Sequence, residues 1–462
     1  MQLPPVQLPG GVLPEITRGV GGTLREITGA RALRTERLLN QHRARLDRDP
    51  RGELVVRAEV IAIDMTDAAL ANARKARFDV RRTREIADLG VKITVLQTPE
   101  GWSASRGLKR LRKLDPEGTY DFNHIYLDVG EVGAATTANA PASPAPGSDV
   151  RNRVGLIDGG VEATHAALRG GVVHQFGCDG NPVPSAHGTA VASLIAGSTA
   201  DFRGAAPHAE LFAADVYCGL PTGGAVEAVA AALGWMAKER VPVINVSLVG
   251  PRNALLERAV KVLSGRGHLI VAAVGNDGPA APPLYPAAYA GVIGVTAVDD
   301  KRRVLLEACR GKHLALAAPG ADLRAADATD STGYKEVRGT SFAAPLVAGL
   351  LARALADPDP VAGANAMAAL TSLALDLGPR GRDDIYGAGL VAANLPEDAH
   401  GLARRPIKGS LSGRSVRSTV RRRIERGEND ARKAARVRPE IQGKARQRRR
   451  TVQGLHGPAL HR

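Results

Sequence analysis

Hydrophobic and polar positions follow two different patterns along the chain, and the pattern changes near residue 150. Between residues 53 and 128, four stretches are typical of strands: "ELVVRAEVIAID", "DVRRTREI", "GVKITVLQTP" and "DFNHIYLDV". Two stretches between them predict helices: "TDAALANARKARF", which opens on Thr66 as the N-cap, and "SASRGLKRLRKL". The order βαββαβ predicts a small ferredoxin-like α+β domain over residues 53–128.

After residue 150 the apolar runs no longer alternate with polar residues. Six runs predict strands that are buried on both faces: "RVGLID", "AELFAADVY", "VPVINVSLVG", "HLIVAAVGN", "GVIGVTAVD" and "LALAAPG". Helical patterns follow in "GTAVASLIAG", "GGAVEAVAAALGWMAKER" and "NALLERAVKVLSG", and a further helix begins near Ser341. This alternation of strands and helices predicts an α/β fold with a doubly wound, mostly parallel sheet over residues 151–400.

Three segments lack a pattern that would form a core. Residues 1–52 are rich in Pro, Gly and Arg, and we interpret them as a leader segment in which "ARALRTERLLNQHRARL" forms a short amphipathic helix. In "GEVGAATTANAPASPAPGSD" the only large apolar residue is Val132, so residues 129–150 predict an exposed linker that is open to proteolysis. Residues 401–462 form a tail that we expect to be disordered.

The net charge of +15 is confined to this tail. Residues 401–462 carry 19 Lys or Arg against 4 Asp or Glu, whereas residues 1–400 carry 43 of each sign. The basic clusters "RRRIER" and "RQRRR" lack interleaved aromatic residues, so any binding to a nucleic acid or an acidic surface would be driven by charge and strongly salt-dependent. We expect a solvated tail, and nucleic-acid binding is the weaker alternative.

No apolar run approaches the roughly 20 residues of a membrane helix, so we expect no membrane span. The first residues also lack a basic region followed by an apolar one, and no export signal is visible. The three cysteines, Cys178, Cys218 and Cys309, are too few for a disulfide scaffold and lack metal-ligand spacing. Two alternatives stay open: three buried thiols, or a Cys178 to Cys218 bridge that would indicate an oxidising compartment.

The stretch "RGTSFAAPLVAG" places hydroxyls at the start of a helix that is otherwise small and apolar. Ser341 is either an N-cap or a nucleophile. Thr340 is an equally good cap, and Pro345 removes the N–H that would have bonded to the carbonyl of Ser341. A nucleophile also requires a base, a carboxylate that orients the base, and a donor for the oxyanion.

Three other polar residues lie where sites of such sheets form, at strand carboxyl ends and helix starts. Asp158 ends a strand in "VGLIDGGV", His187 begins the helix "HGTAVASLIAG", and Asn276 ends a strand in "HLIVAAVGNDG". Each residue alone is explained by a turn or a structural role. Together with Ser341 they supply a carboxylate, a base, an amide donor and a nucleophile, so the set predicts nucleophilic catalysis.

These stretches resemble the motifs of the subtilisin-like serine proteases, and so do "VAAVGNDGPAAPPLYPA", "GTSFAAPLVAGLLA" and "DDIYGAGLVAA", over about residues 150 to 395. The resemblance implies Ser341 as the nucleophile and His187 as general base and then general acid. It implies that Asp158 holds the imidazole, and that Asn276 and the backbone N–H of Ser341 bind the tetrahedral oxyanion.

The resemblance also implies the residues that bind the substrate: Ser247, Leu248, Val249 and Gly275. "NVSLVGP" resembles the family strand that pairs with the substrate backbone, but Val249 stands where members often have Gly. We expect Val249 to narrow the entrance to the pocket for the residue before the scissile bond. Gly159 replaces the usual Thr or Ser, and we expect it to loosen the turn that holds Asp158.

By its position and strand order, the domain at residues 53–128 resembles a protease propeptide, which implies a folding chaperone and an inhibitor. The sequence thus predicts a secreted or periplasmic serine endopeptidase, made as a self-processing zymogen, whose partners are polypeptide substrates and its own propeptide. No cofactor is expected to be required and no metal ligand is predicted, while bound calcium stays open. The alternatives are an accessory binding domain at residues 53–128 and, for the whole chain, a catalytically idle relative that binds peptides.

Overall fold

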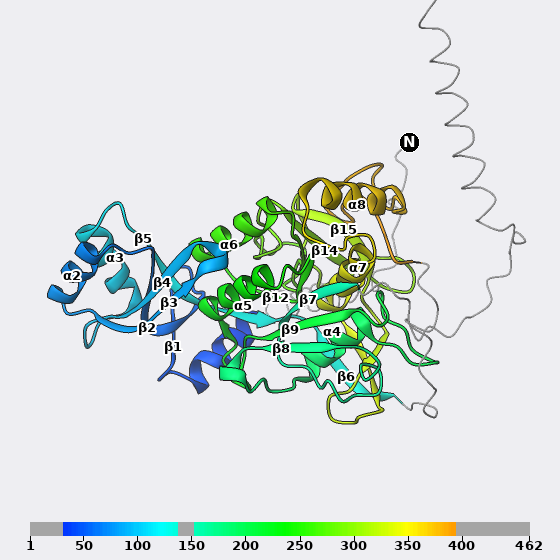
Figure 1. Cartoon of the computed structure of the whole chain (residues 1–462), viewed down its shortest axis with the longest axis horizontal. Coiled ribbons are helices and arrows are strands. Elements are labelled where there is room, and N and C mark those ends of the chain that lie inside the picture. Colours follow the sequence, from blue (N-terminus) through cyan, green and yellow to red (C-terminus); the bar gives the residue numbers. More distant parts are fainter. Residues whose placement is uncertain (1–30, 137–151, 394–462) are drawn as a thin grey trace, which may run out of the picture. The chain divides into compact units, whose positions relative to one another are not determined.

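The N-terminal part of the protein folds as an antiparallel sheet with two helices (Figure 1). In the computed structural model, which describes residues 31–136 and 152–393, its core strand order is β5-β2-β4-β3. Thr66 caps α2 by accepting a hydrogen bond from the Ala69 N–H at 3.2 Å. The predicted order βαββαβ is confirmed. The elements are β2 (Leu54–Ile63), α2 (Asp67–Lys75), β3 (Asp79–Ile86), β4 (Val91–Gln97), α3 (Ala104–Leu114) and β5 (Thr119–Asp128).

This sheet begins earlier in the chain than the sequence pattern indicates. Residues 31–41 are helical, and β1 (Leu46–Arg48) pairs antiparallel with β2. Leu38 and Leu54 belong to one small buried cluster, so part of the predicted leader segment 1–52 is built into the α+β unit. β1 has only three residues, two of them charged, which is too short for a strand period to be visible.

Seven parallel strands form the second sheet, in the order β15-β14-β13-β11-β7-β9-β8. The chain moves from β7 to β8 and β9 on one side and then to β11 on the other. The strand order therefore reverses at β7, and the crevice at its carboxyl end is the expected place for a site. β8 was not predicted because "VHQF" is half polar. The strands are β7 (Arg153–Asp158), β8 (Val173–Phe176), β9 (Glu210–Asp215), β11 (Val243–Val246), β13 (Leu269–Ala273), β14 (Val292–Val298) and β15 (Leu314–Pro319).

Helices pack against this sheet, and a glycine brings one of them close to it. α4 packs against α7, and α5 packs against α6. A side-chain carbon added at Gly188 in α4 would lie 2.4 Å from the carbonyl oxygen of Gly159, so only glycine lets the helix begin this close to the end of β7. The predicted α/β fold is confirmed. The helices of this part are α4 (Ala186–Ala196), α5 (Val226–Lys238), α6 (Ala254–Gly265), α7 (Thr340–Ala352) and α8 (Pro360–Ser372).

The segment predicted as a linker begins with a strand. β6 (Glu131–Thr136) pairs antiparallel with β17 (Tyr334–Arg338), which pairs in turn with β16 (Leu323–Ala326). Backbone hydrogen bonds hold β6 and need no large apolar side chains, so composition did not indicate it. The rest of the predicted linker 129–150 and the tail 401–462 lie outside the described residues. None of the described helices is long and apolar enough to cross a membrane.

β5 joins the two parts of the protein. Its later residues pair antiparallel with β10 (Gly224–Ala225) and then with β12 (Leu248–Val249). The fully buried Tyr126 hydroxyl donates to the carbonyl of Pro251 at 2.6 Å. The strand therefore docks the N-terminal unit on the second part and leads the chain on to Val129, which is buried.

Candidate active site

Asp158 and His187 lie in contact where β7 ends and α4 begins. The Nδ1 atom of His187 lies 2.9 Å from both carboxylate oxygens of Asp158, and both side chains are buried. The backbone N–H of Gly159 donates to Asp158 Oδ1 at 2.7 Å. Because a carboxylate accepts hydrogen bonds, Nδ1 carries the proton in this contact. The structure thus brings together two of the predicted site residues.

Burial and the neighbouring charges shift the pKa values of Asp158 and His187 in opposite directions. Burial raises the pKa of the Asp158 carboxyl above its ordinary value, although His187 opposes this. Burial also acts to lower the pKa of the His187 imidazole. The carboxylates of Asp158 and Asp128 and a hydrogen bond to Val129 outweigh it and raise that pKa to about 9. The two carboxylates therefore favour the doubly protonated imidazole in this arrangement.

Ser341 lies in the first turn of α7 but does not cap it. The N-cap is Gly339, and the buried Oγ atom of Ser341 makes no hydrogen bond within the described part of the chain. The missing N–H of Pro345 leaves the carbonyl of Ser341 without its helical partner, and this carbonyl instead accepts from the Ser247 hydroxyl at 3.0 Å. An unpaired buried hydroxyl is costly, which favours a chemical role for Ser341 over capping.

Thr340, which the sequence pattern suggested only as a cap, orients Asn276. The Oδ1 atom of Asn276 accepts hydrogen bonds from the backbone N–H and the hydroxyl of Thr340 at 3.1 and 3.0 Å. The same hydroxyl accepts from the N–H of Gly275 at 3.2 Å. A side-chain carbon added at Gly339 would lie 2.6 Å from Nδ2 of Asn276, so the amide donor faces the start of α7, where Ser341 lies.

The turn after Asp158 is tight, not loosened as expected. A side-chain carbon added at Gly159 would lie 2.4 Å from the hydroxyl oxygen of Ser185. Ser185 caps α4 by accepting a hydrogen bond from the N–H of Gly188 at 2.9 Å. Glycine at position 159 therefore lets the strand end and the helix start approach each other, which sets His187 against the carboxylate.

The predicted substrate-binding strand is occupied by the chain itself. Leu248 lies opposite Asp128, and Val249 lies opposite Leu127, in the antiparallel pairing of β12 with β5. The carbonyl oxygen of Val129 lies 3.2 Å from the Nε2 atom of the buried imidazole. Since a carbonyl oxygen accepts hydrogen bonds, this contact requires a proton on Nε2 too, and it is one of the causes that raise the pKa of this imidazole.

Beyond Val129 the chain continues along a second strand. Gly130 has a φ of +126°, and a side-chain carbon on it would lie 2.6 Å from the ring of Phe342. Glu131 then pairs with Arg338 in the pairing of β6 with β17. The chain thus crosses the site in extended form, paired with β12 before Val129 and with β17 after it.

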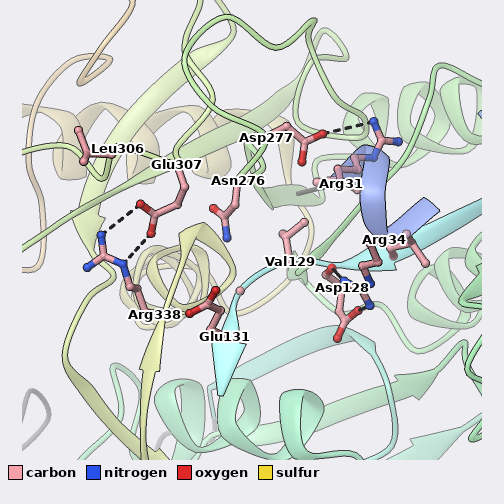
Figure 2. Close-up of a pocket in the computed structure, with 13 residues that line it drawn as sticks. Arg31, Arg34, Asp128, Val129, Glu131, Asn276, Asp277, Leu306, Glu307 and Arg338 are labelled. Atoms are coloured by element: carbon pink, nitrogen blue, oxygen red, sulfur yellow. Dashed lines mark hydrogen bonds and ion pairs between the residues drawn. The ribbon is translucent and has the colours of Figure 1, made fainter. Parts of the chain in front are cut away.

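A cavity of about 520 Å³ lies beside this crossing (Figure 2). Val249, which we expect to narrow the pocket entrance, lines it together with Asn276. The wall also contains charged residues that sequence reasoning missed, and only Asp277 had a signal, because it directly follows Asn276. These residues are Arg31, Arg34, Asp128, Glu131, Asp277, Glu307 and Arg338.

Two of the three cysteines are bonded to each other. Cys178 and Cys218 form a disulfide with a Cα–Cα distance of 5.2 Å, so the bridge is the alternative that the structure supports. Cys309 is a buried free thiol, and burial raises its pKa to about 12. The carboxylate of Asp215 lies near the two bonded sulfurs, which offer no thiolate to a metal. The expectations on cofactors and calcium stay predictions.

Comparison with known proteins identifies the class. The model of the subtilase family matches residues 151–389. Subtilisin DY of Bacillus licheniformis is 33% identical over 247 residues, which span 52% of this chain and 88% of that protein. The major intracellular serine protease of Bacillus subtilis (strain 168) is 31% identical over 250 residues, which span 50% of this chain and 78% of that protein.

A solved structure supports the fold. Fervidolysin from Fervidobacterium pennivorans, a keratinolytic enzyme related to subtilisin, matches with a TM-score of 0.61 at 20% sequence identity. The match covers 74% of this chain and 60% of that one, so it extends beyond the residues that the family model covers. By the family match over more than half of its length, the chain belongs to the subtilase family and is a subtilisin-like serine peptidase that acts on polypeptides.

Proposed function

We propose that this chain is the precursor of a serine endopeptidase that cuts itself between Val129 and Gly130 with Ser341 as the nucleophile. The Ser341 hydroxyl attacks the carbonyl carbon of Val129 and passes its proton to His187. His187 then protonates the leaving amine of Gly130, and water hydrolyses the acyl-enzyme by the same proton route. Asp158 holds the imidazole through Nδ1–H and stabilises the imidazolium.

The oxyanion is bound by two donors in this proposal. The first is Nδ2 of Asn276. The Oδ1 atom of the same amide accepts hydrogen bonds from the backbone N–H and the hydroxyl of Thr340 at 3.1 and 3.0 Å, which fixes the amide. The second is the backbone N–H of Ser341, which lies in the first turn of α7, where N–H groups lack helical partners and favour negative charge. Both donors are fixed before the reaction, but the Val129 oxygen contacts Nε2 of His187 in the described structure, so it must turn from His187 to these donors as the charge develops.

One observation carries the choice of bond: the Val129 carbonyl oxygen lies 3.2 Å from Nε2 of His187 in a segment that is paired on both sides. Gly130 fits the position after the bond because a larger residue would meet the ring of Phe342. In this bound form both imidazole nitrogens donate, so the imidazole must lose its Nε2 proton before it acts as the base.

We also propose that the enzyme works in an oxidising compartment, as a secreted or periplasmic protein. The disulfide between Cys178 and Cys218 supports this, because disulfides persist outside the reducing cytosol. One relative is named as intracellular, so family membership alone does not fix the compartment. The corresponding measurement is the thermal stability of the whole chain before and after reduction of the bridge. We expect reduction to lower it.

The proposal is tested by intact mass and N-terminal sequencing of the whole chain over time. Wild type should yield a fragment that begins at Gly130, whereas Ser341→Ala should stay intact, since loss of the nucleophile in subtilisin lowers kcat by about 10⁶. Ser372→Ala is the matched control: this exposed serine at the end of α8 bonds only to the carbonyl of Ala369 among the described residues, and the variant should process like wild type.

The other outcomes decide between the alternatives. A wild-type chain that stays intact and hydrolyses no peptide would support the catalytically idle relative that binds peptides. Equal cleavage of wild type and Ser341→Ala would indicate a contaminating protease. Cleavage that depends on Ser341 but yields a fragment beginning at a residue other than Gly130 would reject the assignment of the Val129–Gly130 bond.

A further inference from the structure

The cavity beside Val129 contains an acidic residue whose partner lies on the part of the chain that processing removes. We propose that the processed enzyme takes a basic side chain, arginine or lysine, in this cavity, at the position before the scissile bond, and that Asp277 selects it. This inference rests on the proposed function, because that function places Val129 directly before the bond that is cut.

Asp277 is a nearly buried carboxylate that already holds an arginine. Its side chain is 13% exposed and forms an ion pair with Nη1 of Arg31 at 3.4 Å (Figure 2). The Arg31 side chain is 19% exposed and also pairs with Glu53 at 2.7 Å. Burial raises the pKa of the Asp277 carboxyl, and Arg31 acts against this shift. The N-terminal segment thus shows that a guanidinium fits beside Asp277.

Cleavage after Val129, followed by dissociation of the N-terminal fragment, removes the cation and leaves the carboxylate. Arg31 precedes the bond and departs with the N-terminal fragment. On the wall that residues 152–393 contribute, Glu307 and Arg338 neutralise each other through two hydrogen bonds of 2.7 and 3.1 Å. Asp277 is the remaining charge on this wall, and Glu131, the other charged lining residue that stays with the processed enzyme, is also acidic. A buried carboxylate without a cation is unfavourable. A cationic substrate side chain restores the lost pair.

The cavity has room for a side chain longer than valine. Val129 ends in two methyl groups, and about 520 Å³ remains beside it. Val249 and Leu306 supply apolar lining, which suits the methylene stem of lysine or arginine while the charged head reaches Asp277. Valine is sufficient in the precursor because the bond is held in the site by the chain itself and not by its side chain.

The test uses two peptides that differ only in the residue before the cut bond, arginine or the neutral norleucine. We expect processed wild type to favour arginine in kcat/KM, and Asp277→Asn to lower the arginine-to-norleucine ratio by about tenfold or more. Asp277→Glu, which keeps the charge, should retain the preference. Asp357→Asn is the matched control, because this 63% exposed carboxylate pairs with Arg240 outside the cavity, and its ratio should equal that of wild type.

Equal kcat/KM for the two peptides in wild type would overturn the inference and leave the peptidase proposal intact. An unchanged ratio in Asp277→Asn would do the same, since hydrolysis of the norleucine peptide reports that the variant is folded. A wild-type chain that hydrolyses neither peptide would contradict the proposed function and this inference with it.

Discussion

The two sides of the Val129–Gly130 bond are held in different ways. Before the bond, β5 pairs with β10 and β12 and carries a folded unit whose Tyr126 hydroxyl donates to the carbonyl of Pro251. After the bond, within the described residues, β6 pairs with β17 alone. We therefore expect the N-terminal fragment to stay bound as an inhibitor after cleavage, whereas the new N-terminus leaves the site.

The charges of the site divide along the same line. Asp158 has its cation, His187, in the catalytic part, and this pair survives processing. Asp277 has its cation, Arg31, in the part that leaves. If the two proposals hold, the charges for catalysis are complete in the catalytic part, while the charge for substrate selection becomes available only when the N-terminal fragment has gone.

The largest effect on self-cleavage is expected from a substitution at Gly130, where the chain crosses the site. Gly130→Ala places a side-chain carbon 2.6 Å from the Phe342 ring at a φ of +126°, so the bond shifts away from Ser341. We expect self-cleavage to slow by about a hundredfold, the cost of a misplacement near 1 Å, as measured by the rate at which the fragment appears.

Gly265→Ala is the matched control for this change. Gly265 ends α6, and an added side-chain carbon there has open space within 4 Å. This variant should process at the wild-type rate. Normal processing of Gly130→Ala would contradict the position that we assign to the bond.

The second prediction uses the pH dependence of the base. Only the imidazole that has lost its Nε2 proton accepts a proton from Ser341, and the pKa of His187 is raised to about 9. The reactive fraction therefore rises with pH up to that value, and self-cleavage should be about fiftyfold faster at pH 9 than at pH 7. Rates of fragment formation over this range, in a chain that stays folded, provide the measurement, and a flat profile would rule the raised pKa out as the limiting factor.

The smallest effect is expected from a substitution at Tyr126, which tests how tightly β5 holds the N-terminal fragment on the enzyme. Tyr126→Phe removes the hydroxyl that bonds to Pro251 at 2.6 Å and leaves a buried carbonyl without this donor. The loss of about 1 to 2 kcal/mol should weaken inhibition by the N-terminal fragment by roughly tenfold. The inhibition constant of the separated fragment, measured on the processed enzyme, checks this value. An unchanged constant would show that other contacts of β5 hold the fragment.

Much of the fold was predictable because its signals are local. Period, capping and apolar runs identified the α+β unit and six strands of the parallel sheet, and the predicted cap at Thr66 is present. β1 and β6 were not predicted, because β1 has only three residues, two of them charged, and β6 consists mostly of small residues, so neither shows a strand period. These strands form through pairing with distant partners, which local sequence does not encode.

Local sequence patterns were enough to indicate the class of the protein and its candidate site residues: Asp158, His187, Asn276 and Ser341 each lie in a recognisable stretch. Only the tertiary structure decided that Val129 meets His187 and that Arg31 meets Asp277. These contacts join residues far apart in the chain, and each residue alone looks like an ordinary linker, leader or turn residue. Their roles come from the docking of one folded unit on another, which brings together charges and backbone that no local pattern connects.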